Sequence, residues 1–254
     1  LNMMVFESGG SAIVVDAGLM FPEDYMLGVD FVIPDLSYIR SNKPRIQGVV
    51  LTHAHEDHIG ALPFLLREID VPVFGTPFTL GLVQQKLTEL EMNAPAGLHT
   101  ISPDDPLKLG DFSLDFIRVG HSVVDGVGIA IDTPEGLIVH TGDFKISRSD
   151  GGQGTDVRKF ARCGERGVLA LLSDSTNVER EGSTLPDSRV GETMTQILEA
   201  STGRIIVALF ASNIGRIQMI VDIARAAGRK VIISGRSIEA SAEIAKRLGH
   251  LAIP

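Results

Sequence analysis

LTHAHEDHIG, residues 51–60, places His53, His55, Asp57 and His58 within six positions directly after an apolar segment. Residues two apart on an extended chain project to the same side, so His53 and His55 share a direction. Asp57 and His58 follow where the pattern changes to that of a helix. Imidazole and carboxylate groups together are ligands for Zn²⁺, Mn²⁺ or iron. The stretch therefore predicts a metal site at a strand-to-helix junction.

The segments around this cluster alternate between strand and helix patterns. Strands are expected at 11–18, 48–52, 71–75, 112–120, 127–133, 137–143 and 167–175, and helices at 60–69 and 77–92. The continuous apolar runs at 48–52, 167–172 and 205–211 predict buried strands. The Gly-rich segment 147–156 is expected to be a loop.

The pattern becomes more regular after residue 188. A helix at 190–200 is followed by an expected strand (204–209), helix (213–228), strand (230–235) and helix (236–249). Such a βαβα order predicts parallel strands with right-handed crossovers. The sequence ends where a further strand would follow, so we expect a fragment that stops inside its second domain. The expected domains are 1–195 and 196–254.

Composition restricts the partners. The 254 residues carry a net charge of −9, include one cysteine and contain no apolar run of the length that spans a bilayer. We expect no membrane association and a reducing, cytoplasmic location. Residues 1–195 hold 15 Lys and Arg against 28 Asp and Glu, whereas residues 196–254 hold 8 against 4. The basic second part suits a phosphate backbone, although a chance excess in a short segment explains it equally well.

Two more candidate ligands follow strand patterns far along the chain. His121 occurs in RVGHSVVDG, and Asp143 occurs in IVHTGDFK. Each residue alone is more typical of a turn, but both at strand ends would complete a ligand set with the cluster. Asp16, after the strand at 11–15, could orient a metal-bound imidazole or simply occupy a turn.

These motifs resemble a known family. HAHEDH, GHS and TGD, with the early VVDAG, are similar to the signature of the metallo-β-lactamase superfamily. LLSDSTNVEREGSTLPDSRVGETM and FASNIGRIQMIVDIARAAGRKVIISGRS resemble its β-CASP branch, in particular the ribonuclease J family. The resemblance implies an α/β fold: a metallo-β-lactamase αββα sandwich, incomplete here, with the start of an inserted β-CASP domain.

The resemblance also implies a two-metal centre with Zn²⁺ as the expected ion and Mn²⁺ as the alternative. One ion would be held by His53, His55 and His121, the other by Asp57 and His58, with Asp143 as the bridge. Catalytic roles would fall to Asp57, Asp143 and Asp174, the last of which could instead be a turn residue. The family's further histidines would come later in the chain, and His250 is not assigned to that role.

The implied activity is hydrolysis of RNA phosphodiester bonds by a two-metal-activated hydroxide. It would be endonucleolytic and 5′→3′ exonucleolytic, acting on single-stranded RNA with a 5′-monophosphate in rRNA processing and mRNA decay. The full-length protein would be a homodimer or homotetramer. Substrate contacts are expected from Ser212, Asn213, Ser234 and Arg236. Ser212 and Asn213 precede a helix, where free N–H groups bind anions, but an ordinary helix cap is an equal alternative.

Two other functions stay open. A hydrolase of the same fold could use the same ligands on a thioester or lactone, because a metal site alone does not select phosphate. The segment after residue 195 favours the nuclease, since a small-molecule hydrolase would not need it. The second alternative is an inactive RNA-binding scaffold. Asp57 and Asp143 argue against it, because a purely structural zinc site would have no open position.

Overall fold

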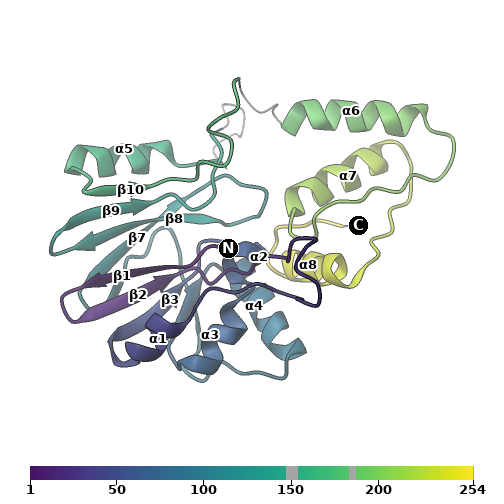
Figure 1. The fold of residues 1–254 in the computed structure, drawn as a ribbon. Coiled ribbons are helices and arrows are strands. Elements are labelled where there is room, and N and C mark those ends of the chain that lie inside the picture. Colours follow the sequence, from purple (N-terminus) through teal and green to yellow (C-terminus); the bar gives the residue numbers. More distant parts are fainter. Residues whose placement is uncertain (147–153, 183–186, 254) are drawn as a thin grey trace.

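Two five-stranded sheets lie face to face in the computed structural model, which describes residues 1–146, 154–182 and 187–253 (Figure 1). The first sheet has the order β1 (Met4–Ser8), β2 (Ser11–Val15), β3 (Ile46–Val50), β4 (Val73–Gly75) and β5 (Leu98–Thr100). Strands β1 and β2 form an antiparallel pair, and the remaining neighbours are parallel. Most of the segment expected to form a loop, 147–153, lies outside the described residues.

The second sheet has the order β10 (Ala170–Leu172), β9 (Gly136–His140), β8 (Val127–Thr133), β7 (Phe112–Arg118) and β6 (Leu107–Leu109). Strands β6 to β9 are antiparallel neighbours, with short connections from β6 to β7 and from β8 to β9 and a longer loop, 119–126, from β7 to β8; β10 runs parallel to β9. The strands predicted at 112–120, 127–133 and 137–143 are confirmed: the second has the predicted bounds, and the first and third end two and three residues early. Their ends deliver the later candidate ligands to one edge of the sandwich.

Helices cover both outer faces. The helices α1 (Ser37–Ser41), α3 (Leu62–Glu68) and α4 (Pro77–Glu89) pack against the first sheet, and α5 (Val157–Arg166) packs against the second. Short helices α2 (Glu56–Ile59) and η1 (Lys43–Arg45) flank β3. The predicted αββα arrangement is confirmed, as are the helices expected at 60–69 and 77–92, the first as α3.

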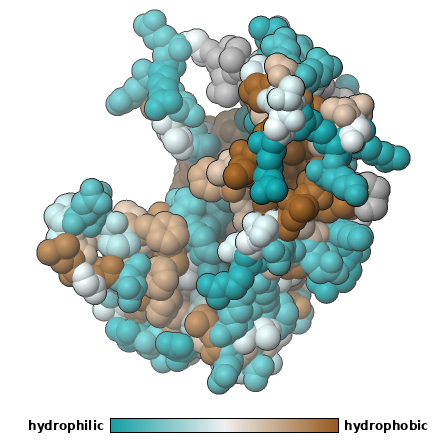
Figure 2. Space-filling model, turned by 90° about the vertical axis from the view of Figure 1, so that its right-hand side faces the viewer, coloured by the Kyte–Doolittle hydropathy of each residue, from teal (hydrophilic) through white to brown (hydrophobic). Residues whose placement is uncertain are grey.

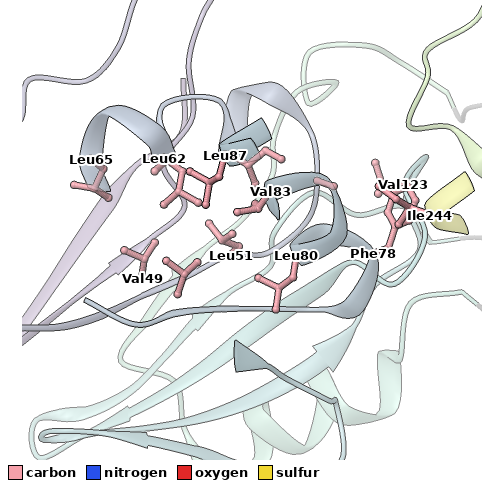
Figure 3. Close-up of a cluster of buried hydrophobic side chains, with 14 of the residues drawn as sticks. Val49, Leu51, Leu62, Leu65, Phe78, Leu80, Val83, Leu87, Val123 and Ile244 are labelled. Atoms are coloured by element: carbon pink, nitrogen blue, oxygen red, sulfur yellow. The ribbon is translucent and has the colours of Figure 1, made fainter. Parts of the chain in front are cut away.

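Three apolar layers hold the sandwich together. Side chains such as Ile13, Phe112 and Phe116 meet between the two sheets. Because alternate residues of a strand point to opposite faces, Ala12 and Val14 of β2 instead join the layer under the helices. Figure 3 shows part of that helix-side layer, in which side chains of α3 and α4 lie over those of β3.

A helical unit follows the sandwich. It consists of α6 (Asp187–Ala200), α7 (Ile214–Ala226) and α8 (Arg236–Arg247), which confirms the three helices predicted there. No helix in the described residues is long and apolar enough to cross a membrane. Helices α4 and α8 contact each other, which places this unit against the sandwich.

The strands predicted at 204–209 and 230–235 are wrong for this structure. Both segments are irregular, and within the described residues neither pairs with another strand. The buried run predicted at 205–211 is likewise wrong, since Ile206 and Phe210 are 89% and 83% exposed. A strand exists only when a neighbour accepts its hydrogen bonds, whereas a helix is complete within one segment. Figure 2, viewed from the side of this unit, shows hydrophobic surface facing outward.

Strand β10 also departs from its prediction. Only Ala170–Leu172 of the run at 167–172 forms a strand, and Val168, Leu169 and Leu171 are exposed rather than buried. The strand lies at the edge of its sheet. Burial of an edge strand depends on what packs over it, which its own apolar residues do not determine.

Candidate metal site

The His cluster lies where β3 meets α2. The chain leaves β3 at Val50 and stays extended to His55, which is the residue preceding the first helical turn. Close packing fixes this turn: a side-chain carbon added at Gly18 would lie 1.6 Å from the backbone oxygen of Asp57. Only glycine fits there, so the VVDAG segment and the histidine segment are in direct contact.

Four ligand atoms from three separate segments converge at this point. They belong to His53, His55, His121 and Asp143, and all lie within 4.8 Å of one another. The Nδ1 atom of His55 is 3.0 Å from Nε2 of His53 and 3.1 Å from Nε2 of His121. Nitrogen ligands of a tetrahedral Zn²⁺ are roughly 3.3 Å apart. The donor types and their spacing therefore fit a divalent metal ion.

A second group of donors shares the Asp143 carboxylate. Its Oδ2 atom is 3.6 Å from Nε2 of His121, whereas its Oδ1 atom is 3.4 Å from Nε2 of His58. The same His58 nitrogen is 3.6 Å from Oδ2 of Asp57. Asp143 thus stands between the first three histidines and the pair Asp57 and His58, as a bridging carboxylate would.

Buried hydrogen bonds set the direction of two imidazoles. The carboxylate of Asp16 can only accept, so His58 donates through Nδ1–H, at 2.7 Å, and Thr52 donates its hydroxyl, at 2.9 Å. The Thr52 oxygen then accepts from Nδ1–H of His53 at 3.1 Å. Both rings therefore direct their Nε2 atoms toward the site, the arrangement typical of metal-binding histidines.

The third imidazole is oriented from another loop. The Nε2 atom of His55 is 3.3 Å from the hydroxyl oxygen of Ser122, next in sequence to His121. With the proton on Nε2, the Nδ1 atom of His55 presents its lone pair to the other ligands. Segments more than sixty residues apart thus set the geometry of one centre.

The histidines of the site differ in the direction of their pKa shifts: three are lowered and one is raised. Burial, reinforced by the other imidazoles, lowers the pKa of His53 well below its ordinary value, and burial with the nearby His121 lowers the pKa of His55 to about 4. Burial also lowers the pKa of His121. These three rings are neutral at pH 7 and able to bind a metal.

The fourth imidazole behaves differently. Burial acts to lower the pKa of His58, but the negative charges of Asp16 and Asp143 outweigh it and raise this pKa to about 10. Burial in turn acts to raise the pKa of Asp143, but its hydrogen bond with His58 keeps that pKa below the ordinary value. In the metal-free chain, the carboxylates are therefore balanced by a cation on His58.

Asp174 lies beside this centre without joining the four-ligand group. Its Oδ1 atom accepts hydrogen bonds from the backbone N–H and the hydroxyl of Thr176. These local bonds are those expected of a turn residue, the alternative role that the sequence left open for Asp174. Its own N–H donates to the hydroxyl of Thr141, and its Oδ2 atom is 3.5 Å from the backbone nitrogen of Phe144. Asp174 therefore contacts both sides of the loop that carries Asp143.

The predicted substrate residues take different positions. Asn213 caps α7, because its side chain accepts the backbone N–H of Arg216 at 3.0 Å. Ser212 lines a cavity of 780 Å³ that also includes His55 and Asp57. Ser234 and Arg236 are exposed and do not line this cavity. His250 is not among the metal-site donors, and its Nε2 atom is 3.9 Å from Oδ2 of Asp125.

The structure adds residues that the sequence did not single out. Asn2 reaches Asp57 at 3.1 Å and His58 at 3.0 Å through its side-chain nitrogen. Lys86 of α4 forms an ion pair with Glu56, and both line the 780 Å³ cavity. The structure also adds Thr52 and Ser122, and the only sequence signal for these two is that each lies next to a histidine. No sequence signal marks Asn2.

Comparison with known proteins agrees with this architecture. Residues 2–157 match the family described as the metallo-beta-lactamase superfamily. The chain belongs to the metallo-β-lactamase superfamily. A crystal structure of a protein of unknown function from Enterococcus faecalis V583 has the same fold, with a TM-score of 0.64 at 15% identity over 92% of this chain and 67% of that one.

Within that superfamily, the chain is similar to ribonuclease J. Residues 202–254 match the family described as ribonuclease J, beta-CASP domain. The chain is 40% identical over 255 residues to ribonuclease J of Helicobacter pylori and 43% identical over 253 residues to ribonuclease J 1 of Streptococcus pyogenes. Both alignments cover 100% of this chain, but only 37% and 45% of the relatives. The chain thus spans less than half the length of these curated relatives.

Proposed function

We propose that the chain carries the metal centre of a ribonuclease that hydrolyses phosphodiester bonds of RNA. The observation that carries the proposal is the convergence of His53, His55, His121 and Asp143 within 4.8 Å. The similarity of the whole chain to proteins named ribonuclease J supports RNA as the proposed substrate. The fold alone would leave the substrate open.

The site is proposed to hold two divalent ions, Zn²⁺ first and Mn²⁺ as the alternative. One ion would be held by His53, His55 and His121, and the second ion by Asp57 and His58. Asp143 would contact both ions. When bound, such ions supply Lewis acidity and an activated water at neutral pH. The chain's own part is to hold the neutral imidazoles in place through Asp16, Thr52 and Ser122, and to orient a nucleophile through Asp57 and Asp143. Asp174 is proposed to support the Asp143 loop.

The substrate is proposed to be single-stranded RNA with a 5′-monophosphate, cleaved endonucleolytically and 5′→3′ exonucleolytically. The 780 Å³ cavity beside His55 supports an extended ligand, because it continues to Ser212, two residues before α7. Ser234 and Arg236, on the same helical unit, are kept as proposed outer contacts. In the cell, we propose cytoplasmic rRNA processing and mRNA decay by a homodimer or homotetramer of the full-length protein.

The test has two stages on the 254-residue chain. Metal content is measured after purification without chelator, and 5′-monophosphorylated single-stranded RNA is then offered as substrate. We expect bound metal and cleavage in the wild type, with loss of cleavage in Asp57→Ala while the fold is retained. Asp104→Ala serves as the control, because Asp104 is an exposed carboxylate in the turn between β5 and β6 and is not among the metal-site donors.

The same assay separates the alternatives. Turnover of a thioester or lactone with no RNA cleavage would indicate a small-molecule hydrolase. RNA binding without cleavage in the metal-loaded wild type would indicate a scaffold. Absence of metal, or full cleavage by Asp57→Ala, would overturn the proposed mechanism.

A further inference from the structure

The loop 121–126 carries one metal ligand and touches another. It begins with His121 and continues with Ser122, whose hydroxyl contacts His55. The chain is closed around the loop, since Val119, two residues before it, donates its N–H to the carbonyl of Gly126, its last residue, at 3.0 Å. A small displacement of this loop would move two of the three histidines of the first ligand group.

Apolar packing holds the middle of the loop against two helices. Val123 is buried and belongs to the apolar layer on the helix side of the first sheet. Figure 3 shows Val123 beside Phe78 of α4 and Ile244 of α8. This contact restrains the loop's distance from the helices, but a methyl-to-ring contact does not by itself fix its rotation.

Asp125 supplies the directional contact. Its Oδ1 atom accepts the hydroxyl of Thr76 at 2.8 Å, and its Oδ2 atom accepts the backbone N–H of Phe78 at 2.9 Å. Phe78 is the second residue of α4, and the residue before the helix, Thr76, makes no side-chain cap of its own. Asp125 therefore caps α4 from 47 residues away, where a negative charge is favoured by the helix dipole.

The backbone at Asp125 is adapted to this contact. Its φ angle is +54°, in the left-handed region that non-glycine residues rarely adopt. Its side chain is largely buried, and this burial raises the pKa of the carboxyl. A strained backbone and a buried carboxylate persist only where surrounding contacts hold them, and here those contacts are the first turn of α4.

We propose that Asp125 is a positioning residue of the metal centre, which fixes the loop 121–126 against α4 and thereby orients His121 and, through Ser122, His55. The inference rests on the metal site of the proposed function. It assigns the start of α4 a second role, as the rigid support of ligands that are distant in sequence.

The test uses Co²⁺, whose visible absorption reports the geometry of its ligands. Asp125→Gly removes the carboxylate but accepts the left-handed backbone, and Asp125→Asn keeps the shape while losing one acceptor. Asp156→Ala is the matched control, because Asp156 caps α5 through the backbone N–H of Lys159 at 3.0 Å. Co²⁺ affinity is measured by competition with a chelator, alongside thermal unfolding of the metal-free proteins.

We expect Asp125→Gly to bind Co²⁺ about 10–100-fold more weakly with an altered spectrum, and Asp125→Asn to shift in the same direction. Asp156→Ala should lose stability without a change in affinity or spectrum. Wild-type affinity and spectrum in folded Asp125→Asn would overturn the positioning role while leaving the metal site intact. Failure of the wild type to bind Co²⁺ and Zn²⁺ would overturn the proposed metal site together with this inference.

Discussion

Replacing Asp16 by Asn tests whether a buried carboxylate controls the direction of His58. The backbone of Asp16 has φ +60°, which asparagine also tolerates, and the substitution preserves size. The amide oxygen can still accept the backbone N–H of Thr52, a bond of 2.8 Å in the wild type. The amide nitrogen, however, then faces Nδ1 of His58, where it can only donate. Nδ1 must therefore give up its proton to accept this bond, which leaves the ring proton on Nε2, the atom that faces the metal site.

The magnitude follows from the contact that is lost. The hydrogen bond between His58 and Asp16 is 2.7 Å long and buried, and bonds to charged groups contribute about 1.5–3 kcal/mol. A loss of about 2 kcal/mol lowers the unfolding temperature of a chain of this size by roughly 4–8 °C. A residue that orients a metal-bound histidine typically changes metal affinity by about 10–100-fold.

The assay compares wild type, Asp16→Asn and Asp35→Asn. Asp35 accepts only local hydrogen bonds from Ser37 at the surface, so its variant controls for loss of a carboxylate. Zinc affinity is measured by chelator competition, and unfolding is measured calorimetrically in excess chelator. Wild-type zinc affinity and an unchanged unfolding temperature in Asp16→Asn would refute the tautomer argument.

Three further outcomes are expected. Phe78→Ala should lower the free energy of unfolding by about 3–5 kcal/mol in urea titrations, because the ring is fully buried; a loss below 1 kcal/mol would contradict the packing. Gly18→Ala should impair zinc binding measured by chelator competition, because its new methyl group collides with the Asp57 backbone, and intact binding would contradict that contact. A hydrogen bond from Lys145 lowers the pKa of Asp187 below its ordinary value of 3.8. The ionised carboxylate therefore stabilises the fold above pH 3.8, and this stabilisation is lost as the pH falls through the lowered pKa of the folded state. The stability advantage of wild type over Asp187→Asn in urea should therefore be constant above about pH 5 and shrink in acid, and a pH-independent difference would argue against the ion pair.

Sequence reasoning located the local part of the candidate site well. The spacing of His53, His55 and His58 across a strand-to-helix junction requires only local geometry, which the structure reproduces. Helices α4, α7 and α8 were predicted within a few residues, because their hydrogen bonds close within one segment. His121 and Asp143 were candidates from their positions after strand patterns, and the resemblance to a known family assigned them to specific metal ions.

The predictions that failed concern contacts between segments. The β-branched runs at 204–209 and 230–235 have strand composition, yet neither is paired within the described residues, and β10 has apolar residues that nothing described covers. Pairing and covering are supplied by other parts of a chain, so the residues of a run predict its propensity and not its partner.

The sequence by itself therefore determined the local donor cluster and the longer helices, since these depend on neighbours a few positions away. Only the tertiary structure decided which atoms face the metal site. The proton on His58 is directed by Asp16, 42 residues earlier, and α4 is capped by Asp125, 47 residues beyond Phe78. Hydrogen bonds of this kind act over about 3 Å in space whatever the separation along the chain, so they exist only after the sheets have packed.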